Sequence, residues 1–264
     1  MTGLSRFHGA ALSFAAGLCA ALCAGGAVSP DEPDALWTIV DGLCVPAQRL
    51  LGSPAPCAQV DISGGSAQGW AVLKDLVGNT QFLLIPTRRI SGVEDGSLVA
   101  AGAPNYWPPA WGARVFMEKA AGRPLARGDV SLTINGAGAR TQDQLHIHID
   151  CPRADVAREL HARLNEIGEA FGDFALRGKA YRARFLPGAE LRLDPFRLVA
   201  ADGPSAPLKD NSLAVFGAQR PDGAPGFVLL ARKAPGGTAH LEDLQDHQCE
   251  ILRAAQPKAA SDIR

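Results

Sequence analysis

Two histidines stand two positions apart in the stretch TQDQLHIHID, residues 141–150. If this stretch forms a β-strand, its side chains alternate between the two faces of a sheet. One face is then apolar and the other carries the polar side chains, which are Gln144, His146, His148 and Asp150. Neighbouring imidazoles oppose each other's protonation, so a neutral ring with a free lone pair is available near neutral pH.

This polar face is open to three interpretations. The first is an ordinary half-exposed strand with no chemical role. The second is a metal site, in which His146 and His148 bind zinc, copper or iron together with Asp150. The third is nucleophilic catalysis at phosphorus, in which one imidazole attacks while its neighbour and backbone N–H groups stabilise the phosphoryl oxygens.

The sequence also predicts the elements that must hold this strand. Apolar spacing predicts helices over residues 34–51, 110–123, 154–172 and 243–253, and strands over 129–136 and 144–151. Hairpins are expected over 70–90, turning at Gly78 and Asn79, and over 213–235. Strands mixed with separate helices, without regular alternation, predict an α+β fold with an antiparallel sheet and flanking helices.

The two predicted hairpins resemble each other, each with a short apolar strand, a polar turn and a second apolar run followed by basic residues. One interpretation is a degenerate internal duplication whose second copy has lost its histidine strand. The other is strand patterning alone, which produces short similarities of this kind.

The first thirty residues differ from the rest of the chain. Arg6 precedes an uncharged segment, residues 9–28, and acidic residues follow it. About twenty apolar residues reach about 30 Å as a helix, enough to cross a bilayer core. The charges place the body outside the cytoplasm. Residues 1–30 are therefore expected to be a membrane anchor, giving an inner-membrane protein with a periplasmic domain, or a signal peptide that is cleaved to release the protein into the periplasm.

The remaining residues, 31–264, are long enough for one domain with its own core and show no linker. The net charge of the chain is −1, which argues against nucleic acid as a main partner. Four cysteines in this part suggest two disulfides in an exported protein. Cys44 and Cys57 are close in sequence and are paired here, which leaves Cys151 with Cys249; four cysteines allow three pairings.

The passage SLTINGAGARTQDQLHIHI, residues 131–149, resembles the histidine-triad superfamily of nucleotide hydrolases and transferases. In that superfamily an Asn at a strand end, a glycine-containing loop and a polar turn precede alternating histidines. Asn135 and the turn ending in Thr141 match the first features, and Gln144, His146 and His148 match the three histidines. The upstream segment LLIPTRRI, residues 83–90, resembles a second superfamily segment, with Arg89 where a histidine is common.

Within the superfamily, nearly the whole body looks like the CDP-diacylglycerol pyrophosphatases. The segments that carry this resemblance are LCVPAQ, PAPCAQV, WAVLKDLVGNTQFLLIPTRRISGVE, ARTQDQLHIHIDC and LQDHQCEILR. The resemblance implies hydrolysis of CDP-diacylglycerol to CMP and phosphatidate at a membrane surface, without a metal or other cofactor. The alternative function is a periplasmic metal-binding protein that uses the His-x-His strand.

Roles follow from the matching positions. The resemblance implies that His146 attacks the CMP phosphorus, that His148 and Thr141 bind phosphoryl oxygens, and that Asn135 positions the ribose or phosphate. Gln144 departs from the pattern: it can hydrogen-bond a backbone or ring nitrogen and hold His146 in one tautomer, but it cannot carry a proton.

Other assignments depend on single residues. Lys74 and Arg89 are candidates to attract the diphosphate. If the triad motif is aligned two residues further along the sequence, His148 becomes the nucleophile instead. The spacing from Thr141 argues against this alignment. The neighbouring pair Asp246 and His247 is expected to be structural or to lie at the rim of the site.

Overall fold

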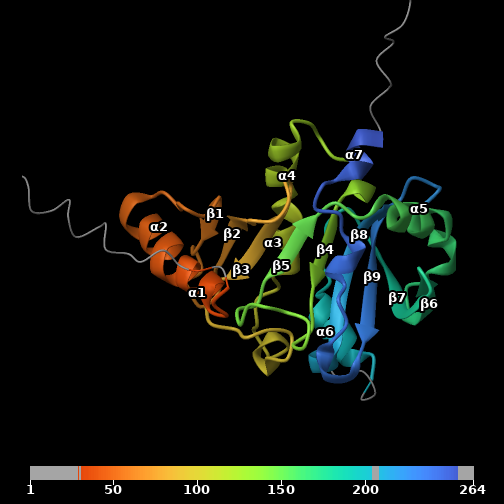
Figure 1. Ribbon diagram of the computed structural model, residues 1–264. Helices are drawn as coiled ribbons and strands as arrows, with labels where there is room; N and C mark the ends of the chain where they lie inside the picture. Colours follow the sequence, from red (N-terminus) through yellow and green to blue (C-terminus); the bar gives the residue numbers. More distant parts are fainter. Residues whose placement is uncertain (1–28, 30, 204–207, 255–264) are drawn as a thin grey trace, which may run out of the picture.

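The computed structural model describes residues 29, 31–203 and 208–254, so the predicted leader and anchor segment lies almost entirely outside the described residues. Among the described residues, no helix has both the length and the apolar character that a membrane crossing requires. The rest is an α+β domain built on one nine-stranded antiparallel sheet (Figure 1).

The strands lie in the order β1-β2-β3-β5-β4-β8-β9-β7-β6. Their bounds are β1 Gln59–Asp61, β2 Trp70–Lys74, β3 Phe82–Pro86, β4 Ser131–Ile134, β5 Ile147–Asp150, β6 Gly172–Leu176, β7 Lys179–Pro187, β8 Asn211–Gln219 and β9 Pro225–Lys233. Both predicted hairpins are confirmed, as β2–β3 and β8–β9. The histidine strand β5 pairs with β3 on one side and β4 on the other, so it lies in the interior of the sheet.

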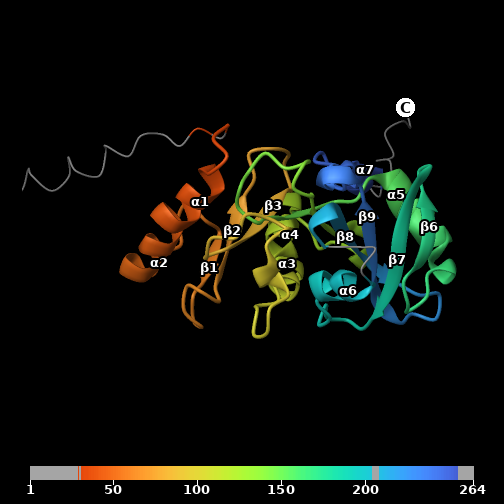
Figure 2. The same ribbon diagram turned by 90° about the horizontal axis from the view of Figure 1, so that it is seen from below.

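Helices cover both faces of the sheet (Figure 2). On one face lie α3 Trp107–Gly112, α4 Arg114–Ala121 and α6 Pro195–Ala201, which enclose the largest part of the core. On the other face, α1 Ala35–Ile39, a π-helical turn Val40–Cys44 and α2 Val45–Leu51 cover the β1–β3 end, while α5 Ala154–Ala162 covers the β6–β9 end.

The histidine face lies between these two covers. His148 is paired across the sheet with Leu83 and Thr133, and Thr133 is paired with Ala214, so all four residues share a face. Leu83 packs under α1 and α2, and Ala214 packs in the cluster under α5. Between these two covers lies the C-terminal segment of residues 239–249, the covering segment, which contacts Thr133 through Gln245 and His148 through Glu242.

The strand order repeats. The unit β2–β3, α3–α4, β4–β5 has the order β2-β3-β5-β4, and the unit β6–β7, α6, β8–β9 has the order β6-β7-β9-β8; the two units meet at the β4–β8 pair. The topology therefore matches the second predicted hairpin to β4–β5, and not to β2–β3 as the sequence similarity predicted. Strand β9, which takes the place of β5, has no histidine.

Two predicted helices are too long. The helix expected over 154–172 ends at Ala162, and Gly172 begins β6. Arg163 donates to the carbonyl of Ala175 and stacks on Phe174, which fastens the β6–β7 hairpin back onto the helix end. The C-terminal helix α7 spans only Glu250–Ala254.

The residues before α7 are held by other bonds. Gln245 forms an isolated antiparallel β-bridge with Pro152. The Asp246 carboxylate accepts hydrogen bonds from the N–H groups of Gln248 and Glu250. Cys249 has φ of 51°, outside the right-handed helical region. Cys249 therefore precedes the helix, contrary to the sequence prediction.

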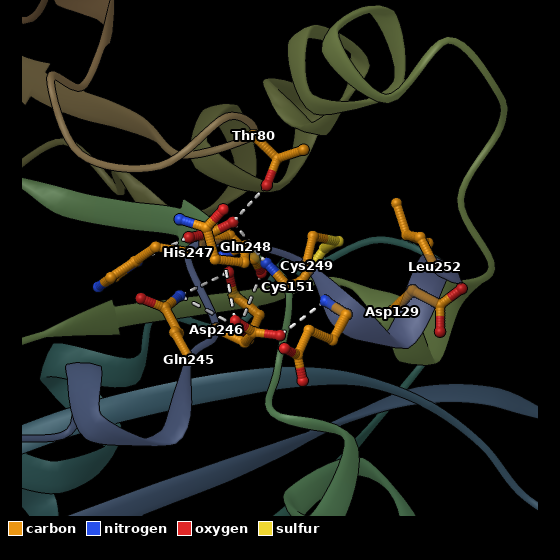
Figure 3. The surroundings of a disulfide bond; sticks show 12 residues. Thr80, Asp129, Cys151, Gln245, Asp246, His247, Gln248, Cys249 and Leu252 are labelled. Atoms are coloured by element: carbon orange, nitrogen blue, oxygen red, sulfur yellow. Dashed lines mark hydrogen bonds and ion pairs between the residues drawn. A yellow bond between two sulfur atoms is a disulfide. The ribbon is translucent and has the colours of Figure 1, made fainter. Parts of the chain in front are cut away.

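Both expected disulfides are present, Cys44–Cys57 and Cys151–Cys249. The second links the residue after β5 to the C-terminal segment, 98 positions further along the chain (Figure 3). Two disulfides in one domain indicate an extracytoplasmic protein, because the cytosol keeps thiols reduced.

Candidate active site

The two histidines lie in contact at the start of β5. Strand β5 begins at Ile147, so His146 stands just before the strand and His148 within it. Their rings meet edge to face with centroids 4.8 Å apart. Only 8% of His146 and 6% of His148 is exposed. The predicted pairing of the imidazoles on one face is therefore present, although the strand is shorter than expected.

His146 is fixed by the backbone. Its Nδ1 lies 2.7 Å from the carbonyl oxygen of Gln144. A carbonyl only accepts, so Nδ1 carries the proton and Nε2 carries the lone pair. Burial lowers the pKa of His146 below its usual value. A neutral ring with its Nε2 lone pair unprotonated is the form that a nucleophile requires.

His148 has a different set of neighbours. Its Nδ1 lies 2.8 Å from Nε2 of Gln81 and 3.2 Å from the Glu242 carboxylate. Burial, together with the adjacent His146 ring, holds the pKa of His148 well below its usual value. This ring is therefore also neutral near pH 7.

Glu242 connects the histidine strand to the C-terminal segment. Its carboxylate accepts from Gln81 at 3.0 Å and from Nδ2 of Asn135 at 3.1 Å. The Asn135 carbonyl oxygen in turn accepts from the N–H groups of Leu241 and Glu242. Asn135 therefore secures the covering segment. Glu242 could not be picked out from the sequence, because it lies outside the histidine motif and about a hundred positions away.

The C-terminal segment also contributes His247 to the site. Its Nδ1 lies 2.9 Å from the Asp150 carboxylate, which also accepts from Thr80 at 2.8 Å. The hydrogen bond to Asp150 raises the pKa of His247, while burial raises that of Asp150. A Cβ at Gly78, where φ is +68°, would lie 2.4 Å from the His247 carbonyl oxygen, so the β2–β3 turn must be glycine to lie against His247. His247 thus belongs to the polar network around β5.

Gln144 does not reach either imidazole with its side chain. Its amide nitrogen donates to the carbonyls of Pro86 and Arg88, and its amide oxygen accepts from the N–H of Ile90. The side chain is fully buried and serves the backbone that follows β3. It is the backbone carbonyl of Gln144, and not its amide, that fixes the tautomer of His146.

Three other predicted residues are not in contact with the imidazoles. Lys74 is paired with Phe82, which is paired with Ile149, so it lies on the opposite face from His148; its amine donates to backbone carbonyls of the β2–β3 turn. Arg89 pairs with Asp34 and stacks on Trp37 of α1. Thr141 is exposed in the loop before β5.

Arg140, the neighbour of Thr141, is a cation that acts on His146 through its charge. The Arg140 guanidinium bonds the carboxylates of Glu94 at 2.8 Å and Asp143 at 3.0 Å. Its positive charge contributes to lowering the pKa of His146. Its place in the polar turn of the motif was the available signal, although only Thr141 of that turn was expected to bind phosphate.

The predicted metal ligands are not arranged as a metal site. Within residues 29, 31–203 and 208–254, no three His, Cys, Asp or Glu side chains form a group suited to a metal ion. The Asp150 carboxylate is instead bonded to Thr80, His247 and the backbone N–H of Cys151.

A cavity of about 670 Å³ adjoins the network. Glu242 and His247 form part of its wall, and its cationic side chains are Arg153, Arg177 and Lys179. Cations of this kind favour an anionic ligand, phosphate above all.

Two comparisons with known proteins show the family of this chain. A family model described as CDP-diacylglycerol pyrophosphatase matches residues 31–253, which include all nine strands, both disulfides and the covering segment. The CDP-diacylglycerol pyrophosphatase of Yersinia pestis is 40% identical over 225 residues, covering 83% of this chain and 85% of that protein. The chain belongs to the CDP-diacylglycerol pyrophosphatase family.

Proposed function

We propose that the site hydrolyses CDP-diacylglycerol through a covalent intermediate in which the cytidylyl group is attached to Nε2 of His146. The overall reaction, the release of CMP and phosphatidate from CDP-diacylglycerol, follows from the family. The assignment of individual residues is the proposal, and the observation that carries it is the bond from Nδ1 of His146 to the Gln144 carbonyl.

The reaction has two steps. In the first, the Nε2 lone pair attacks the cytidylyl phosphorus, a P–N bond forms, and the P–O bond to phosphatidate breaks. In the second, water attacks the same phosphorus and loses a proton, the P–N bond breaks, and CMP leaves with His146 restored. His148 and the loop at Thr141 stabilise the phosphoryl oxygens in both steps.

Cationic side chains around the site attract the anionic diphosphate of the substrate. Arg140 places its charge near His146, and we assign the remaining attraction to Arg153, Arg177 and Lys179 in the cavity beyond Glu242. Lys74 and Arg89 have no part in this proposal, because Lys74 lies on the opposite face of the sheet from His148 and Arg89 is held against Asp34 and Trp37 at α1. Neither step requires a metal.

The repeated strand order supports a histidine-triad-like unit that has been duplicated. In the second unit, the face that continues from His148 carries Ala214, Phe216, Val228 and Leu230, all apolar and buried under α5. That half therefore has a structural core where the first half has its catalytic face.

We further propose that residues 31–264 form the hydrolase domain and that residues 1–30 bring it to the periplasmic side of the inner membrane. The disulfides and the lipid substrate both support this arrangement. An anchor raises the local enzyme concentration where the substrate resides.

The position of attack can be measured directly. When the protein hydrolyses CDP-diacylglycerol in detergent micelles in ¹⁸O-water, we expect the label in the phosphate of CMP, because both steps occur at the cytidylyl phosphorus. Mass spectrometry of the two products checks this. Label in phosphatidate would contradict the proposal, since it would place the attack on the other phosphorus.

A further inference from the structure

We propose that Gln81 is a positioning residue, which holds His148 in the tautomer that points an Nε2–H donor at the transferred phosphoryl group. The inference rests on the proposed function, in which His148 stabilises phosphoryl oxygens. It adds a residue outside the histidine motif and gives a physical reason why the two adjacent histidines act differently.

The position of Gln81 is well defined. It is fully buried just before β3, next to Thr80, which donates to Asp150. Its amide nitrogen lies 3.0 Å from Oε1 of Glu242 and 2.8 Å from Nδ1 of His148. One side-chain nitrogen therefore faces two different groups.

Glu242 determines the orientation of this amide. A carboxylate only accepts hydrogen bonds, so the amide group that faces it must be the NH₂. The opposite orientation would place the amide oxygen against the carboxylate. Asn135 donates to the other carboxylate oxygen, which holds Glu242 in place.

The orientation of the amide then determines the tautomer of His148. The same NH₂ group lies 2.8 Å from Nδ1 of His148, nearer to it than the Glu242 carboxylate oxygen at 3.2 Å. A proton on Nδ1 would oppose this donor, so Nδ1 accepts. A neutral imidazole that accepts at Nδ1 carries its proton on Nε2.

The Nε2–H of His148 has no protein partner. This atom is buried and has no hydrogen bond within the described part of the chain. Buried donors are nearly always paired, so an unpaired one at a candidate active site points to a ligand. An oxygen of the phosphoryl group that His146 attacks is an acceptor of the right kind.

The two rings are thus held in opposite tautomers by different partners. The Gln144 carbonyl leaves a lone pair on Nε2 of His146, and the Gln81 amide leaves a proton on Nε2 of His148. One ring is prepared to attack phosphorus and the other to donate to its oxygens.

The test combines ring ¹⁵N NMR without substrate and steady-state kinetics on the full chain. In the wild type we expect His146 protonated at Nδ1 and His148 at Nε2. In Gln81→Glu the new side chain accepts from Nδ1–H, so neutral His148 should carry its proton on Nδ1 and lose the Nε2–H donor, while His146 keeps its own tautomer. We expect kcat to fall about 10²-fold, the usual loss for one phosphoryl or oxyanion donor, with a smaller change in KM.

The pH profile of kcat should also change in Gln81→Glu. In the wild type the acid limb of kcat lies on the acid side of the usual imidazole pKa, because burial lowers the pKa of His146 and its ring must be neutral to attack. A carboxylate at position 81, beside the two imidazoles, favours a protonated ring, so the limb should move to higher pH. Gln81→Leu, which leaves Nδ1–H free to donate to Glu242, should reproduce the fall in kcat if Gln81→Glu does not fold. Gln219→Glu, an exposed change on β8, should alter neither measurement.

Two results would overturn the inference: Nδ1–H on His148 in the wild type, or an unchanged kcat in both Gln81 variants. The tautomers are measured without substrate, so that result does not depend on the proposed function. A protein with the expected tautomers that releases no CMP would contradict the function instead.

Discussion

Replacing His146 with alanine is expected to abolish CMP release from CDP-diacylglycerol, with a fall in kcat of about 10⁴-fold or more. The imidazole is the proposed nucleophile, and among the residues that the structure describes no other group offers the same neutral Nε2 lone pair with its Nδ1 fixed by a carbonyl. The measurement is CMP release in detergent micelles, followed by chromatography.

Two matched variants make the result specific. His148→Ala removes a donor and not the nucleophile, so its kcat should fall by about 10²- to 10³-fold. His161→Ala removes an exposed histidine on α5 and should leave kcat unchanged. If His146→Ala stays active while His148→Ala loses all activity, the nucleophile is His148 and the register shifted by two is correct.

Removing the Cys151–Cys249 disulfide with Cys249→Ser is expected to destabilise the protein and inactivate it. The disulfide closes a separation of 98 residues, and chain entropy assigns about 4.7 kcal/mol to a loop of about 100 residues. It also fastens the segment that contributes Glu242, Gln245 and His247 to the β5 face. Thermal unfolding and CMP release, each with and without reductant, measure the two effects.

The other disulfide provides the control. Cys44–Cys57 closes 13 residues beside α1 and α2 and has no contact with the covering segment in the described structure. Cys57→Ser should therefore lower the melting temperature but retain kcat at temperatures where the protein is folded. Full activity of Cys249→Ser below its melting temperature would show that the covering segment holds its place without the disulfide.

The two hairpins and the histidine face could be predicted because both depend on local periodicity. The hairpins at β2–β3 and β8–β9 alternate or run apolar over short distances, and His146 and His148 follow the two-residue period of a strand. The disulfide partners could be predicted because one pair is close in sequence, which leaves a single choice for the other.

The partners of the histidines could not be predicted, because they come from distant parts of the chain. Gln81 and Glu242 are 161 positions apart, yet their side chains meet at His148. Glu242 and His247 reach the sheet in an irregular segment, where the sequence pattern predicted a helix over part of the range. Only the packing of this segment on β5 brings the two residues into the site.

Gln144 shows how a motif can mislead about a single side chain. Its position in the pattern suggested contact with His146, and contact exists, but through the backbone. Three hydrogen bonds hold its amide to residues 86–90, so Gln144→His would leave part of that backbone unpaired. The substitution that completes the triad in sequence would therefore not reproduce the triad in space.

Isolating the covalent intermediate tests most directly whether His146 is the nucleophile. The protein is mixed with CDP-diacylglycerol, quenched with base within the first turnover to preserve the P–N bond, digested, and analysed by mass spectrometry. We predict a cytidylyl group on His146, at a level that follows turnover and is absent in His146→Ala. A cytidylyl group on His148, or full wild-type turnover without any labelled histidine, would contradict it.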